Sequence, residues 1–468
     1  MSEDRTPTAP RTVATDEDTS GLAPRVDRWE AARPPLGRTV REDAEALAQH
    51  ISEAEDLLAA LPPRPERDRT QRQDAARLAD GGRRLRDRFL RLHAESVYDT
   101  LTDGRTRHPR VDELVYAAAE AFPGLVPTRA RIAAELRHIQ AHKEGREIDQ
   151  GIFFRALLRS PKAGAHLVDS MLLPTRRALD LLPGFRRDGR ADLGTVLIER
   201  RGAAAHVTVN NQSCLNAEDN RLMADLETAV DLALLDDGVR VGVLRGGVMD
   251  HPRHRGRRVF SAGINLRHLR EGRISFVDFL LGRELGLLNK LAKGVIPDPD
   301  PDAFPDRTVQ KPWIGVVDSF AIGGGTQILL VLDRVIAAED AYFSLPAAQE
   351  GIVPGTGNLR LGRLTGSRPA RRIILGGHRI AATDPDAGFL CDQVVPTAGL
   401  DAAVEASVRE LDSPAVVANR RMLGLAEEPA DAFRAYLAEF SLVQAYRSYS
   451  EDVLEKVGRA WARPGASG

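Results

Sequence analysis

The sequence is poor in cysteine, since its 468 residues include only Cys214 and Cys391. Two thiols are too few for a disulfide framework or a cysteine-rich metal site, and this composition favours a reducing compartment. No run of about 18 uncharged apolar residues is present, and the polar N-terminus lacks the apolar stretch of a signal peptide. We therefore expect a cytoplasmic protein with no membrane partner.

An excess of charge of one sign is also missing. Lys and Arg number 65, Asp and Glu number 67, and aromatic residues make up only 5% of the chain. This balance argues against a nucleic-acid partner, which needs a basic surface. The hydrophobic fraction of 43% and the charged fraction of 28% are ordinary for globular proteins and exclude wholesale disorder.

The first part of the chain divides into two compositions. Residues 1–38 are rich in Pro, Thr, Asp and Arg without apolar periodicity, which predicts a disordered arm. From residue 39 onward apolar residues recur every three or four positions, as at Leu47, Ile51 and Ala54. This spacing is typical of amphipathic helices and predicts a helical N-terminal domain over residues 39–190.

From residue 191 the pattern changes to that of an α/β protein. Short β-branched runs, Val207 to Val209 and Val239 to Leu244, alternate with a helical pattern from Asn216 to Leu235. After Pro414 the pattern is helical again. We expect residues 191–468 to form one catalytic domain with C-terminal helices.

A glycine run suggests an anion site. Ile314 to Ile322 is predicted as a strand, followed by Gly323-Gly324-Gly325 and a helix over Thr326 to Ala337. Backbone N–H groups at a helix start suit an anion, although a tight turn is the simpler alternative. The run is neither a Walker loop nor a GxGxxG motif. Two further segments accompany it, Val259 to Leu266 and Phe343 to Gly355.

In this order and spacing the three segments resemble the crotonase (enoyl-CoA hydratase/isomerase) superfamily, over about residues 190 to 460. The resemblance implies a spiral of ββα turns that binds an acyl-CoA and holds its thioester oxygen with two backbone N–H groups. At the matching positions these catalytic donors are Ile264 and Gly324. Each such donor, aimed at a developing enolate oxygen, contributes roughly 3 kcal/mol.

Departures from the hydratase pattern narrow the reaction. Hydratases of this superfamily carry two glutamates, and the matching positions here hold Gln327 and Ala347. Without both carboxylates, hydration of an enoyl-CoA loses its acid and base. Glu350, three residues after Ala347, is a poor substitute by position.

One branch of the superfamily is a closer match: the cofactor-independent dioxygenases of glycopeptide-antibiotic biosynthesis. They oxidise (3,5-dihydroxyphenyl)acetyl-CoA with O₂ to 3,5-dihydroxyphenylglyoxylate and free CoA, using neither metal nor organic cofactor. The match includes the helical extension, which ordinary crotonases lack, and four segments: Phe260 to Leu266, Arg283 to Gly286, Phe320 to Gln327 and Tyr342 to Pro346.

This branch implies contacts from Glu218, Arg283 and Gln327 to the ring hydroxyls, and a catalytic part for Gln327. Each residue has an alternative interpretation from sequence alone. Glu218 suits the first turn of a predicted helix in any case. Arg283 interrupts an apolar helix and can be solvated or locally paired, although the resemblance favours a buried, paired arginine. Gln327 can cap its turn.

The CoA itself is expected to meet a basic loop, His251 to Arg258, since arginine suits phosphate groups. A solvated loop is the alternative. The predicted CoA-binding residues are His251, Arg253, His254, Ala262, Gly263, Ile264 and Asn265. We predict no metal site: the His251 and His254 pair lacks a third ligand. The triplets His93-Ala94-Glu95 and His142-Lys143-Glu144 are expected on solvated helix faces.

The predicted partners are an arylacetyl-CoA and O₂, and the resemblance implies a homo-oligomer, a trimer or a pair of trimers. No residue is identified as the base that removes the first proton. Two rival functions stay open: another crotonase-type reaction, such as thioester hydrolysis or isomerisation, and a non-enzymatic nucleic-acid-binding or scaffolding role.

Overall fold

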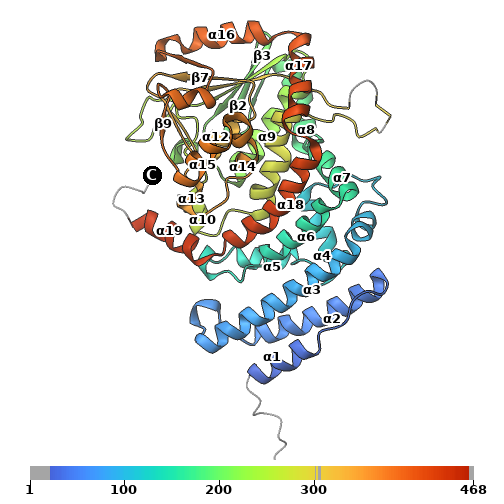
Figure 1. Ribbon diagram of the computed structural model, residues 1–468. Helices are drawn as coiled ribbons and strands as arrows, with labels where there is room; N and C mark the ends of the chain where they lie inside the picture. The colour runs from blue at the N-terminus through green and yellow to red at the C-terminus, as the bar shows by residue number, and fades with distance from the viewer. Residues whose placement is uncertain (1–21, 301, 304–306, 463–468) are drawn as a thin grey trace, which may run out of the picture.

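The computed structural model describes residues 22–300, 302–303 and 307–462, with side chains up to residue 456. Its first part is helical (Figure 1). The two longest helices of this part, α2 and α3, begin with capping boxes, Thr39 with Glu42 and Asp68 with Gln71. The N-terminal helices are α1 (Leu22–Ala31), α2 (Val40–Ala59), η1 (Arg64–Glu66), α3 (Arg69–Leu101), α4 (Val111–Ala121), α5 (Arg129–Glu135), η2 (Gln140–His142), α6 (Glu147–Arg159), α7 (Pro161–Leu172) and α8 (Arg176–Asp188).

The prediction of a disordered arm over residues 1–38 is wrong from Leu22 onward; residues 1–21 lie outside the described residues. Helix α1 buries Val26 and Trp29 against α2 and α3. The Trp29 indole N–H donates to the carbonyl oxygen of His50 at 2.9 Å, and the two rings stack. Leu22, Val26 and Trp29 are spaced by four and three residues and pack in one cluster, so the helix has a short apolar period that the composition of the arm concealed.

The expected α/β architecture is confirmed for the second part of the chain. Among the described residues a seven-stranded sheet has the order β1-β2-β3-β4-β5-β7-β10. Its first three strands are antiparallel and the others are parallel. A smaller sheet has the order β6-β8-β9. The strands are β1 (Arg190–Asp192), β2 (Val196–Arg201), β3 (Ala204–Val209), β4 (Val241–Gly246), β5 (Trp313–Val317), β6 (Phe320–Ile322), β7 (Arg334–Ala338), β8 (Tyr342–Ser344), β9 (Ile380–Ala381) and β10 (Gln393–Val395).

The predicted helix over Thr326 to Ala337 is wrong after Leu329. The helix, α12, ends at Leu329, and Arg334–Ala338 is the buried strand β7. The predicted strand from Ile314 to Ile322 is likewise two strands, β5 and β6, in different sheets. A short apolar run fits both helix and strand, and only pairing with a neighbouring strand decides between them.

The remaining helices cover the sheets and continue into the C-terminal part (Figure 1). They are η3 (Gln212–Cys214), α9 (Asn220–Leu235), α10 (Leu266–Arg270), the π-helical turns η4 (Phe276–Leu281) and η5 (Arg283–Leu288), α11 (Asn289–Lys293), α12 (Gly324–Leu329), α13 (Ala347–Glu350), α14 (Gly357–Thr365), α15 (Ser367–Gly376), η6 (Pro385–Phe389), η7 (Thr397–Gly399), α16 (Leu400–Leu411), α17 (Pro414–Glu427), α18 (Ala430–Arg447) and α19 (Glu451–Ala462).

Two hydrophobic cores meet at η4 and η5. Phe276 and Leu285 belong to the core of the N-terminal helices, whereas Phe279 and Leu287 belong to the core of the sheet. Helix α18 lies along α6 and joins the N-terminal core (Figure 1). The N-terminal helices therefore share their core with later parts of the chain, and the division into domains at residue 190 stays a prediction.

A histidine between the N-terminal helices should make the fold acid-sensitive. His166 accepts from the Tyr98 hydroxyl at 2.7 Å and donates to the Arg105 carbonyl oxygen at 3.0 Å. Burial lowers the pKa of His166 to about 4. Between this value and the ordinary pKa of 6.5 the unfolded chain binds a proton that the folded chain does not, so stability falls as pH falls.

We expect the free energy of unfolding in urea to drop between pH 6.5 and pH 4 by about 1–2 kcal/mol through His166 alone, allowing for solvent screening. His166→Gln should reduce this loss, and the exposed His378→Gln serves as the matched control. Equal acid sensitivity in wild type and His166→Gln would contradict the assignment.

Candidate active site

Ile264, the first predicted oxyanion donor, lies where two distant segments meet. The Glu218 N–H donates to Gly263 O at 2.7 Å, and the Asn265 N–H donates to Glu218 O at 2.8 Å. Glu218 and Ile264 thus form a parallel bridge. In such a bridge the N–H of the residue between the two bonds points away from the partner. The Ile264 N–H is therefore directed away from Glu218 and is available to a ligand.

Gly324, the second predicted donor, is the first residue of α12. Strand β6 ends at Ile322, Gly323 turns the chain with a φ of 54°, and Gly324 is the first helical residue. The first N–H groups of a helix have no partner within it. The Ile322 N–H donates to Ser261 O at 2.9 Å, which places the two donor segments side by side. The structure thus brings the segments of Ile264 and Gly324 together, and their part as oxyanion donors stays a prediction.

Arg283, on the widened turn η5, is 4% exposed and forms the centre of a buried polar cluster. The solvated alternative for this residue is excluded. Its Nε donates to Glu218 Oε2 at 2.9 Å, Nη1 donates to Glu284 Oε1 at 2.7 Å and Gln327 Oε1 at 3.1 Å, and Nη2 donates to Gly324 O at 2.8 Å and Glu218 Oε1 at 3.4 Å.

These contacts use all five N–H donors of the guanidinium. A ring hydroxyl near Arg283 must therefore donate its own hydrogen to a remaining lone pair of Glu218, or accept from Gln327. Since Arg283 can only donate, Gln327 turns its oxygen toward it and its NH₂ group away. Burial raises the pKa of Glu218, although Arg283 opposes this effect.

The two positions that match the hydratase glutamates in sequence lie on α12 and α13. Gln327 lies on α12 beside Arg283, and Ala347 is the buried first residue of α13. Glu350 ends the same short helix, about one turn beyond Ala347. Burial raises the pKa of Glu350. Glu350 thus extends from a backbone position three residues after the one that matches the second hydratase glutamate.

Of the predicted CoA-binding loop, the structure brings His254 toward the site. Its ring meets Phe320 edge-on at 5.4 Å between centroids, and His251 lies 5.9 Å from His254. The Arg253 N–H donates to His251 Nδ1 at 3.3 Å. Phe320 packs in one cluster with Ala262 and Ile322, next to the oxyanion segments.

The other predicted CoA-binding residues form the segment Ala262 to Asn265, which includes the first predicted donor, Ile264. The Ala262 N–H donates to Leu215 O at 3.1 Å. Gly263 has a φ of 85°, and Asn265 caps α10 by accepting from the His268 N–H at 3.0 Å. The cap gives Asn265 a structural part, and its contact with CoA stays a prediction.

Sequence reasoning missed Glu284, which accepts from Arg283, and Thr356, which donates to Glu284. The detectable signal was the pair of adjacent charges, Arg283 and Glu284, within an apolar helical run. The expectation of solvated His-x-Glu triplets is wrong for His93, which is buried and lies 2.7 Å from Asp43.

Within the described ranges, no group of three His, Cys, Asp or Glu side chains is arranged to hold a metal ion. Over the same part of the chain, each helix is too short or too polar to cross a membrane.

The chain is similar to known proteins. The model of the enoyl-CoA hydratase/isomerase family matches residues 306–424. The chain is 56% identical over 425 residues, 91% of its length, to 97% of a (3,5-dihydroxyphenyl)acetyl-CoA 1,2-dioxygenase from Amycolatopsis orientalis. It is 30% identical over 202 residues, 43% of its length, to 68% of a probable enoyl-CoA hydratase from Rhizobium meliloti.

Among solved structures, an enoyl-CoA hydratase from Mycobacterium avium subsp. paratuberculosis aligns with a TM-score of 0.47 at 21% identity, covering 57% of this chain and 99% of that one. The relative from Amycolatopsis orientalis matches both the helical extension and the catalytic part. The chain therefore belongs to the same family as that dioxygenase, within the crotonase (enoyl-CoA hydratase/isomerase) superfamily.

Proposed function

We propose that this protein is a dioxygenase without metal or organic cofactor, which converts (3,5-dihydroxyphenyl)acetyl-CoA and O₂ to 3,5-dihydroxyphenylglyoxylate and free CoA. The observation that carries the proposal is the 56% identity to a dioxygenase of this name over 91% of the chain. The buried polar cluster beside Gly324 supports it, since Glu218 and Gln327 offer an acceptor and a donor to ring hydroxyls.

The reaction begins with loss of a proton from the CH₂ group next to the thioester. The resulting enolate oxygen is held by the N–H groups of Ile264 and Gly324. At roughly 3 kcal/mol for each donor and about 1.4 kcal/mol for each pKa unit, the two donors ease this deprotonation by about four units.

The enolate then supplies the electrons that reduce O₂, and a C–O bond forms at the former CH₂ carbon. The peroxide attacks the thioester carbonyl carbon and CoA leaves as its thiolate. Loss of the second CH proton breaks the O–O bond and leaves a ketone. Both atoms of O₂ remain in the arylglyoxylate, so the substrate alone is the reductant.

The test is to titrate O₂ uptake against CoA release with (3,5-dihydroxyphenyl)acetyl-CoA, before and after exhaustive chelation. One O₂ for each CoA, unchanged by chelation, is the expected result. CoA release without O₂ would indicate thioester hydrolysis instead. Activity that vanishes on chelation and returns only with iron would contradict the cofactor-free reaction.

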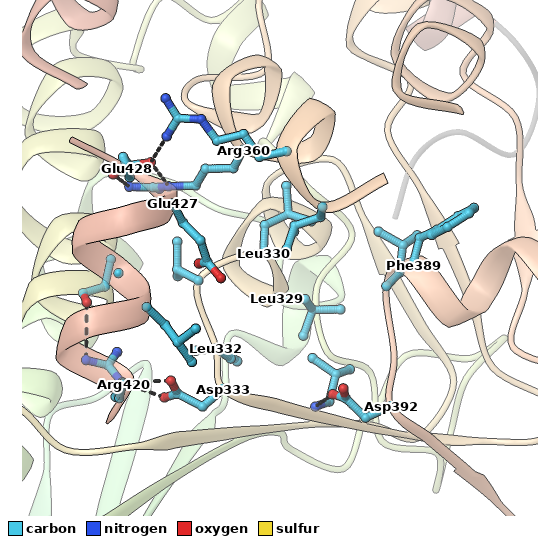
Figure 2. A pocket seen from close by; sticks show the side chains of 18 of the residues that line it. Leu329, Leu330, Leu332, Asp333, Arg360, Phe389, Asp392, Arg420, Glu427 and Glu428 are labelled. Carbon is cyan, nitrogen blue, oxygen red and sulfur yellow. Dashed lines mark hydrogen bonds and ion pairs between the residues drawn. The ribbon is translucent and has the colours of Figure 1, made fainter. Parts of the chain in front are cut away.

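We also propose that the enzyme is cytoplasmic and forms a homo-oligomer, a trimer or a pair of trimers. The proposal of an oligomer is supported by a cavity of about 360 Å³ lined by α12, α14 and α17 (Figure 2). Leu364, Phe389 and Leu423 line it and are exposed in the single chain, which an apolar contact between copies would cover. Light scattering at several protein concentrations measures the assembly, and a monomer throughout would contradict this part of the proposal.

The missing hydratase carboxylates give a further prediction. In Gln327→Glu the new carboxylate would pair with Arg283, but the second position, Ala347, would still lack one. We expect crotonyl-CoA hydration by this variant to equal that of wild type, and the double variant with Ala347→Glu to be faster by roughly 10²-fold. Efficient hydration by the single variant would mean that Glu350 supplies the second group.

A further inference from the structure

A series of hydrogen-bonded residues with alternating charges connects the buried polar cluster around Arg283 with Glu428. Glu284, which is 2% exposed, accepts from Arg283 on one oxygen. Its other oxygen accepts from the Thr356 N–H at 2.8 Å and from the Thr356 hydroxyl at 2.6 Å. The hydroxyl in turn accepts from Arg360 Nη1 at 2.7 Å.

Arg360 continues the series to the cavity of Figure 2, where its guanidinium forms a two-pronged pair with Glu428 at 2.9 and 3.0 Å. Lys293 Nζ donates to the carbonyl oxygen of Glu428 at 3.1 Å. The order of charges from Glu218 to Lys293 is therefore negative, positive, negative, positive, negative, positive. Each buried charge has an opposite neighbour, which is the condition for keeping it buried.

The hydrogen bonds of this series have a fixed direction. A guanidinium can only donate, so the Thr356 hydroxyl must accept from Arg360 and give its single hydrogen to Glu284. The Thr356 hydroxyl therefore cannot point its hydrogen away from Glu284 without losing both hydrogen bonds. The backbone of Gly355 also encloses Glu284 closely: a Cβ there would lie 2.1 Å from Glu284 Oε1. The Glu284 carboxylate is held in one orientation.

From this geometry we infer that Thr356 and Arg360 are positioning residues for ring recognition. They fix Glu284, and Glu284 together with Glu218 holds the Arg283 guanidinium. Arg283 in turn orients the Gln327 amide so that its NH₂ group is free for a hydroxylated ring. The inference rests on the proposed function, because it deepens the account of how that site selects its substrate.

Thr356→Val tests the inference, because it keeps the shape of the side chain and removes both hydroxyl bonds. The expected result is a loss of kcat/KM of roughly 10-fold or more for (3,5-dihydroxyphenyl)acetyl-CoA, with a change within about 3-fold for phenylacetyl-CoA. Thr356→Ser keeps the hydroxyl, so the ratio of kcat/KM for the dihydroxyphenyl ester to kcat/KM for phenylacetyl-CoA should return to the wild-type value. Thr365→Val is the matched control: this buried threonine on α14 donates to Leu361 O and has no bond to Glu284.

The dissociation constants of both esters, measured without O₂ by calorimetry, separate this inference from the proposed function. If wild type consumes no O₂ with the dihydroxyphenyl ester, the proposed function fails, and the ratio of dissociation constants still decides the part of Thr356. Arg360→Lys provides a second variant that keeps the charge next to Glu428. In this variant too, the preference in kcat/KM for the dihydroxyphenyl ester over phenylacetyl-CoA should fall. Equal losses for both esters in Thr356→Val would reduce Thr356 to a structural residue and overturn the inference.

Discussion

Arg283→Ala should lower the free energy of unfolding by about 3–5 kcal/mol, because it leaves two buried carboxylates, Glu218 and Glu284, without their common partner. Oxygenation of the dihydroxyphenyl ester should fall far more than that of phenylacetyl-CoA. The reason is that Arg283 orients both Glu218 and Gln327, which are the groups able to bond a ring hydroxyl. A phenyl ring without hydroxyls gains nothing from that orientation.

The measurement is urea unfolding together with kcat/KM for the two esters. Arg283→Lys keeps the charge and serves if the alanine variant does not fold. Arg267→Ala is the matched control, since Arg267 is an exposed arginine paired with Glu271 at 2.9 Å. If both esters lose the same factor, Arg283 supports only the fold, and the ring assignment is wrong.

Gly324→Ala should reduce kcat by roughly 10²–10³-fold, the usual effect of losing one oxyanion donor. A Cβ at Gly324 would lie 2.2 Å from Glu218 Oε2, too close for any real contact. Either the Glu218 carboxylate or the start of α12 must move, and both belong to the site. The change therefore displaces the donor from the enolate oxygen.

Stopped-flow measurement of CoA release gives kcat for this variant directly. Gly388→Ala is the control, because a Cβ at Gly388 would meet no atom within 4 Å. An unchanged kcat in Gly324→Ala would show that the Gly324 N–H does not hold the oxygen, and the resemblance would have misplaced this donor.

Local pattern predicted much of this fold, and it failed where pairing with distant segments decides the structure. The helix expected over Asn216 to Leu235 is long and periodic and forms as α9 from Asn220 onward. The expectation that Glu218 lies in its first turn is wrong, because Glu218 precedes the N-cap Asp219 and bridges to Ile264. Arg334–Ala338 was wrongly included in a helix, because its strand character depends on pairing with Ile314 to Val317 on one side and Gln393 to Val395 on the other. Periodicity within one segment carries no information about such neighbours.

The site residues also divide into those predicted from local motifs and those that depend on distant contacts. Ile264 and Gly324 followed from motifs that resemble a known family, and each motif is continuous in sequence. The contact of Glu284 with Thr356 joins residues 72 positions apart, and no spacing rule brings them together. The adjacent charges of Arg283 and Glu284 in an apolar run are a signal of burial that the sequence prediction did not use for Glu284. Only the folded chain shows which partners balance them.

The turn that carries Arg283 has one face in each of the two cores, with Leu285 packed among the N-terminal helices and Leu287 packed against the sheet. The Phe276 N–H is also bonded to Glu147 of α6 at 2.8 Å. Melting of either core would therefore release the same turn, so loosening of the helical extension and loss of substrate selectivity should share one transition on heating. The extension then acts as part of the enzyme's selectivity, although the ring-contact and oxyanion residues assigned here all come from later in the chain.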